Sequence, residues 1–162
     1  MRRDVKAKVK AYKVNLGWST LEVLLVDLPR KIEATVIANL SREYKEPLTV
    51  GLPEEVVNPC SLALAYLYTL EDLDTGTRIR NKAILLLMNL LGLNQAKDVV
   101  EAVKDCKTVA LIGTRGEPEK VLADVASKLG IKEYYIKPEE ANCTLEDENL
   151  EKITLSRINM LR

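Results

Sequence analysis

Two short segments of the chain combine residue types that can bind an anion. The first is Gly113-Thr114-Arg115-Gly116, which follows an apolar run at residues 109–112 and precedes a helical pattern. A glycine-bearing loop between a strand and a helix can hold a phosphate group with its backbone N–H groups. The segment matches neither GxGxxG nor GxxxxGK[ST], and Glu117 and Glu119 would repel an anion. We therefore favour an ordinary strand-to-helix turn, with a small phosphate-ligand site as the alternative.

The second segment, residues 77–82, places Arg78, Arg80 and Lys82 at the expected start of an apolar helix. The positive end of the helix dipole repels cations there, at a cost of several tenths of a kcal/mol each, roughly. Free helix N–H groups together with Arg and Lys side chains nevertheless make a good anion site. The alternative is a solvated basic turn offset by the carboxylates at residues 71–74. The spacing of these cations, taken alone, favours the solvated basic turn.

The parts of a catalytic site are missing elsewhere in the sequence. The chain contains no histidine, which removes the commonest general base, the commonest zinc ligand and every Ser-His or Cys-His arrangement. Carboxylate pairs such as Glu54-Glu55 fall in expected turns, and no acidic cluster has the spacing of metal ligands. We therefore predict no catalytic residues, no metal site and no cofactor, and expect that the protein is not an enzyme.

The cysteines and the hydropathy pattern bear on the compartment. Cys60, Cys106 and Cys143 are widely spaced and odd in number, which predicts reduced, buried thiols. The charged start of the chain does not resemble a secretory signal. The longest apolar run, residues 83–93, contains Asn89 and is too short to span a bilayer. We expect a soluble cytoplasmic protein without a membrane partner.

The charge balance limits the kind of nucleic-acid binding that is possible. The 24 basic and 24 acidic side chains cancel, which argues against wrapping of nucleic acid by the whole surface. A local basic patch remains possible, and residues 1–13 hold six cations against Asp4 alone. The sequence leaves the role of this basic N-terminus open.

The elements that must position these residues follow from hydrophobic periodicity and from helix-end signals. Alternation over residues 5–11 and the apolar run at residues 21–28 predict a β-hairpin; a short helix capped by Ser19 is the alternative, which Pro29 would end too early. Further along we predict helices at 29–44, 59–70, 77–91 (ended by Gly92), 95–103, 118–129 and 145–161, and strands at 48–50, 107–112 and 133–136. The chain is thus expected to form a single α/β (α+β) domain over residues 1–162. Its sheet should be mixed and largely antiparallel, with about four to five strands packed by about six helices.

A family resemblance rests on residues 58–103. Asn58-Pro59-Cys60 opens an Ala/Leu-rich helix, and Thr77-Arg78 opens an apolar helix after a glycine-containing break. Gly92-Leu93-Asn94-Gln95-Ala96 then leads into a short helix. In this order the stretch resembles the centre of the PRPK-binding protein family (TPRKB), the small non-catalytic subunit of the KEOPS tRNA-modification complex. Asn94 stands where the family has an arginine.

The resemblance implies an accessory subunit. It would bind the atypical kinase/ATPase of KEOPS and the tRNA 3′ acceptor (CCA) end, while the complex installs threonylcarbamoyl on an adenosine. The predicted RNA-binding residues are Arg78, Arg80 and Lys82, from the basic start of the helix, and Gln95, from the resemblance. The alternatives are a divergent paralogue acting as a protein-interaction adaptor without RNA binding, or a phosphate-ligand domain using residues 113–116. The kinase-binding surface and the oligomeric state are left open by the sequence.

Overall fold

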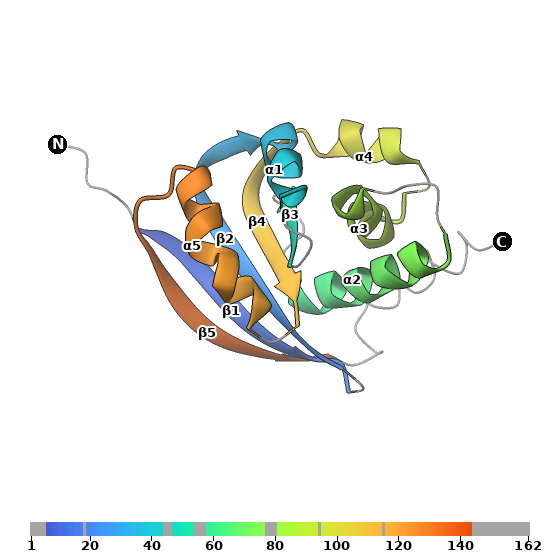
Figure 1. The fold of residues 1–162 in the computed structure, drawn as a ribbon, viewed down its shortest axis with the longest axis horizontal. Coiled ribbons are helices and arrows are strands. Elements are labelled where there is room, and N and C mark those ends of the chain that lie inside the picture. The colour runs from blue at the N-terminus through green and yellow to red at the C-terminus, as the bar shows by residue number, and fades with distance from the viewer. Residues whose placement is uncertain are drawn as a thin grey trace.

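The structure is a computed structural model that describes residues 6–17, 19–43, 47–53, 58–76, 81–93, 95–114 and 116–143. The elements follow one another as β1 (Ala7–Asn15), β2 (Thr20–Glu33), α1 (Ala34–Ser41), β3 (Leu48–Leu52), α2 (Pro59–Asp74), α3 (Lys82–Leu91), α4 (Ala96–Ala102), β4 (Asp105–Gly113), α5 (Glu117–Lys128) and β5 (Tyr134–Asn142) (Figure 1). Apart from the helix expected at 145–161, which lies outside the described residues, this is the predicted order.

The five strands form one mixed sheet in the order β3-β4-β2-β1-β5. Neighbours pair antiparallel except β1 and β5, which run parallel. The prediction of an α/β fold with a largely antiparallel sheet is confirmed, with five helices in the described part of the chain where about six were expected. Within these residues, no helix is long and apolar enough to cross a membrane.

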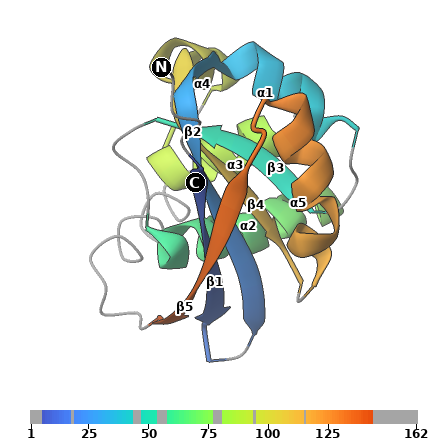
Figure 2. The same ribbon diagram turned by 90° about the vertical axis from the view of Figure 1, so that its left-hand side faces the viewer.

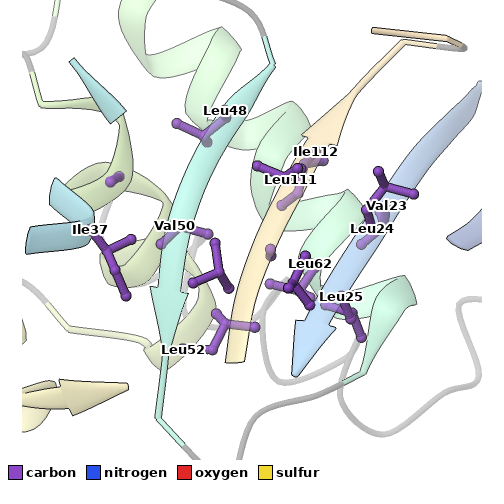
Figure 3. Packing of buried hydrophobic residues seen from close by; sticks show 14 of the residues in the cluster. Val23, Leu24, Leu25, Ile37, Leu48, Val50, Leu52, Leu62, Leu111 and Ile112 are labelled. Atoms are coloured by element: carbon purple, nitrogen blue, oxygen red, sulfur yellow. The ribbon is translucent and has the colours of Figure 1, made fainter. Parts of the chain in front are cut away.

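Helices cover both faces of the sheet. α5 packs across β2 and β4 on one face, whereas α2 lies on the other and also packs against α3 (Figures 1 and 2). The central strands β2 and β4 contribute runs of buried residues, as expected of strands covered on both faces. Figure 3 shows side chains of β2, β3 and β4 gathered with Leu62 of α2 and Ile37 of α1 in this core.

The predicted hairpin is confirmed, but the helix expected after it begins later than predicted. β1 and β2 pair from Val9 opposite Val26 to Asn15 opposite Thr20. β2 then continues past Pro29 to Glu33, so α1 begins at Ala34 and the predicted start at Pro29 is wrong. The pairing of β2 with β4 is irregular between Asp27 and Ile32. Proline lacks an N–H group, and such an irregularity lets it lie within a strand without costing a ladder hydrogen bond.

Helix ends in the central segment follow the sequence signals. The Asn58 side chain accepts hydrogen bonds from the N–H groups of Cys60 and Ser61 at 2.9 and 3.2 Å, which caps α2. Gly92 ends α3 as predicted, with φ 70°, a left-handed conformation that glycine adopts readily. Within the described residues α3 begins at Lys82, later than the predicted Thr77. β5 extends to Asn142, well beyond the predicted end at Ile136.

The cysteines differ from the prediction of three free thiols. Cys60 at the start of α2 and Cys143 after β5 form a disulfide across a sequence separation of 83 residues, so that prediction is wrong for this pair. The disulfide lies in a small apolar cluster with Leu64 and Ala141. Cys106 is free and buried, as predicted. Since two cysteines are paired, thiol content no longer argues for a reducing compartment.

Candidate functional site

Two of the four predicted RNA-binding residues lie in the part of the chain that the structure describes, and two do not. Arg78 and Arg80 lie outside the described residues. Lys82 is the first residue of α3 and is half-buried. Gln95 is exposed directly before α4, and its side chain makes no capping hydrogen bond. The structure thus places Lys82 and Gln95 at the starts of two consecutive helices and leaves the two arginines as predictions.

The start of α3 is already capped from within the chain. The side-chain oxygen of Asn81 accepts a hydrogen bond from the Ile84 N–H at 3.1 Å. The first turn contains no acidic residue, so its positive partial charge is not offset there. Because it has this acceptor, the Ile84 N–H is not available to an approaching anion.

A cleft of about 520 Å³ opens beside the first half of α3. Its apolar walls come from α1, α3 and the end of α4, namely Ile37, Ala38, Ile84, Leu87, Val99 and Val103. The charged residues Glu33, Lys104 and Asp105 also line it. Its volume lies within the range typical of ligand-binding clefts. Sequence reasoning missed the cleft, because each wall taken alone is an ordinary amphipathic or apolar helix.

Gly51 of β3 lies at the base of the cleft, where the backbone must approach two side chains closely. A Cβ atom on Gly51 would lie 2.5 Å from the Cys106 Sγ and 2.8 Å from the Ile37 Cδ1, so no other residue fits without displacement. Burial, together with the charge of Asp105, raises the pKa of the Cys106 thiol to about 11. Cys106 is therefore a protonated packing group at neutral pH and not a nucleophile.

The glycine loop at residues 113–116 is occupied by a carboxylate of the chain itself. Gly116 adopts φ 89°, and its N–H donates to the Glu22 Oε2 at 3.2 Å. The next N–H group, that of Glu117, donates to the Thr114 carbonyl at 3.1 Å. Arg115 lies outside the described residues. Because both N–H groups already have acceptors, a phosphate would have to displace the Glu22 carboxylate.

Metal-ligating residues do not gather in the part of the chain that the structure describes. No group of three or more Cys, Asp or Glu side chains there is arranged to hold an ion.

The remaining candidate surface is the sheet face on which lysines of β1 lie beside tyrosines. Sequence reasoning read the alternating lysines as a sign of a strand but not as a binding surface, since the pairing with β5 could not be seen.

Comparison with known proteins adds no assignment. No protein-family model matches the chain, and no curated protein sequence matches it significantly. Function is therefore inferred from the residues, their geometry and the resemblance of residues 58–103.

Proposed function

We propose that the protein is an accessory, non-catalytic subunit of the KEOPS tRNA threonylcarbamoyladenosine-modification complex. In this role it binds the complex's kinase/ATPase and the acceptor end of tRNA in the cytoplasm. The observation that carries the proposal is the placement of the residues that resemble the family. Asn58 caps α2, Gly92 ends α3 in the left-handed conformation and Gln95 directly precedes α4. Asn58 and Gly92 thus perform the helix-end roles that the resemblance gives them, and Gln95 stands where the short helix was expected to open.

The cleft beside α3 supports the protein-binding part of the proposal. Its walls are largely apolar, and carboxylates and a lysine lie among its lining residues. A buried apolar centre with a polar margin is the usual composition of a protein-protein interface. In the proposed complex, the kinase/ATPase inserts apolar side chains between α1 and α3.

Ala38→Arg is expected to weaken kinase binding at least tenfold, because the new side chain would fill the cleft and place a charge against its apolar walls. Ala38 is half-buried on α1 and lines the cleft. Arginine is a good helix former, so α1 should remain folded. The measurement is calorimetric titration of the purified kinase/ATPase from the same source into each variant.

The matched control is Asn39→Arg, which adds the same charge at the next position of α1. Asn39 is exposed and does not line the cleft. This variant should bind the kinase like wild type. Equal affinities for the Ala38→Arg and Asn39→Arg variants would rule out the cleft, and no binding by wild type would argue against the proposed function itself.

The double variant Arg78→Ala, Lys82→Ala is expected to bind tRNA more weakly than wild type. Its affinity should also depend less on salt, because each lost phosphate contact lowers the slope of log K against log salt by about one unit. Filter binding at several salt concentrations measures both quantities. Kinase affinity should be nearly unchanged.

Trimmed tRNA provides the control for the acceptor end. Wild type should distinguish intact tRNA from tRNA without its CCA tail, and the double variant should distinguish them less, as should Gln95→Ala. Equal affinity and equal salt slope for wild type and double variant would instead favour the adaptor that does not bind RNA. The phosphate-ligand alternative is less well supported, since Glu22 occupies the Gly116 N–H.

A further inference from the structure

Lysine and tyrosine side chains of β1 and β5 lie together on one face of the sheet. Residues that stand opposite one another on paired strands share a face. Lys8 of β1 is paired with Tyr135 of β5, Lys10 with Lys137, and Tyr12 with Glu139. These residues, together with Lys107, are named the lysine-tyrosine face below. Figure 2 looks toward the β5 edge, with β1 next to it.

The lysine-tyrosine face is accessible and is hollowed along the neighbouring strands. Tyr135 is 48% exposed, while Lys8, Lys10 and Tyr12 are half-buried. A hollow of about 570 Å³ lies beside them, with Lys10, Tyr12, Asp27 and Lys107 among its lining residues. On this face α2 covers part of the sheet and contacts β1 and β5, whereas α5 packs across β2 and β4 on the opposite face.

The charge of this surface is positive although the chain as a whole is neutral. Lys137 is paired with Glu139 at 3.4 Å. Lys8, Lys10 and Lys107 form no ion pair with any other residue that the structure describes. Asp27 is a carboxylate in the hollow and opposes them. Three lysine charges are thus left for an external anion.

We propose that the lysine-tyrosine face binds single-stranded nucleic acid, with phosphates against the lysines and bases stacked on Tyr135 and Tyr12. Lys8 and Lys10 are two residues apart on a strand, roughly 7 Å, a spacing that an extended strand of nucleic acid can follow. Tyrosine rings stack on any unpaired base and so provide affinity without sequence preference. Lysine supplies phosphate contacts that depend on salt. This site is separate from the start of α3 and does not rest on the proposed function.

An anionic membrane surface has the same charge, but the side chains on this face favour nucleic acid. The exposed apolar residue of β5, Ile136, stands opposite Val9 and lies on the other face of the sheet. The leucines in the hollow, Leu25 and Leu28, are buried. Among the described residues of this face, only the tyrosines are therefore available to enter a lipid surface. Their rings are better suited to stacking on unpaired bases than to insertion into a membrane.

The test is fluorescence anisotropy with a labelled oligouridylate of twelve nucleotides, which has no CCA end and needs no kinase. Lys8→Ala, Lys10→Ala, Lys107→Ala in one chain should weaken binding at least tenfold. The same triple variant should flatten the salt slope by about two units, since each phosphate contact on a single strand contributes about 0.7. Tyr135→Ala alone should weaken binding about fivefold or more, because stacking on one aromatic side chain is worth about that much. Asp27→Asn should strengthen it.

The matched control is Lys97→Ala, Lys120→Ala, Lys128→Ala, which removes the same charge at three exposed positions on α4 and α5, away from the lysine-tyrosine face. This control should bind like wild type, and all variants should unfold at the wild-type temperature. Equal weakening by both triple variants would overturn the proposal, as would an unchanged affinity of Tyr135→Ala. Tighter binding to a duplex of the same length, or lysine-dependent binding to phosphatidylserine vesicles without binding to the oligouridylate, would also overturn it.

Discussion

Removal of the Cys60–Cys143 disulfide is expected to lower the free energy of unfolding by about 4.5 kcal/mol, as the chain-entropy model gives for a closed loop of this size. The cross-link spans 83 residues and joins the start of α2 to the end of β5. Its loss leaves the unfolded chain with many more conformations while the native contacts of the apolar cluster around Leu64 remain. Urea denaturation of the Cys60→Ala, Cys143→Ala variant, compared with oxidised wild type, measures the difference.

Reductant supplies the control. Dithiothreitol should lower the denaturation midpoint of wild type toward that of the double variant and should leave the double variant unchanged. Thiol titration of the denatured protein should find one free thiol before reduction, that of Cys106, and three afterwards. Three thiols in protein purified and denatured without reductant would show that the bond does not form.

Asn89→Asp is expected to destabilise the protein by roughly 3 kcal/mol or more at pH 7, because it buries a carboxylate next to another one. Asn89 is buried on α3, where its Nδ2 donates to the Thr69 Oγ1 at 3.3 Å and to the Asp72 Oδ2 at 3.1 Å. The substitution replaces this donor by an anion that faces Asp72. Thermal or urea denaturation at pH 7 gives the loss.

The pH dependence of the Asn89→Asp variant provides a second measurement. Burial and the charge of Asp72 would raise the pKa of the new carboxyl group in the folded state above its unfolded value. Its destabilising effect should therefore grow as the pH rises through the normal range of an aspartate and shrink toward pH 4. A loss that does not change between pH 4 and pH 7 would contradict a charge-based cause.

Asn89→Leu is the matched control for the same position. It removes the donor, but it also removes the Asn89 Oδ1, which is buried without a partner among the described residues. The Thr69 hydroxyl retains its hydrogen bond to the Ala65 carbonyl at 2.7 Å. This variant should lose at most about 1 kcal/mol, because replacing an amide by an apolar group of similar size leaves little unsatisfied. A loss as large as that of Asn89→Asp would show that the amide packs in a way that neither group can replace.

The parts of the fold that depend on local sequence were predictable. The alternation of Val9 and Ala11 with lysines marked β1, Asn58-Pro59 marked the start of α2, and Gly92 marked the end of α3. Each signal acts through the residue itself or through neighbours within one turn of helix or one strand, so a single sequence contains it.

The parts that depend on distant partners were not predictable. Pro29 is a good first residue of a helix, and only the irregular pairing of β2 with β4 explains why it lies in a strand. The disulfide requires that Cys60 and Cys143 meet, which no local pattern indicates. The cleft arises from helices that are individually ordinary, and the lysine-tyrosine face depends on the parallel pairing of β1 with β5. Of the candidate site, the sequence indicated the start of α3 and, through the resemblance, Gln95 before α4.

The position of β5 beside β1 has a consequence for how the chain is made. Residues 7–15 leave the ribosome early, together with their partner β2, but their other neighbour, residues 134–142, is synthesised more than a hundred residues later. Until then β1 is an open edge that another nascent chain can pair with. Translation that terminates before residue 134 would therefore yield a product prone to aggregation rather than a smaller working protein. Slow completion of translation should prolong the same exposure.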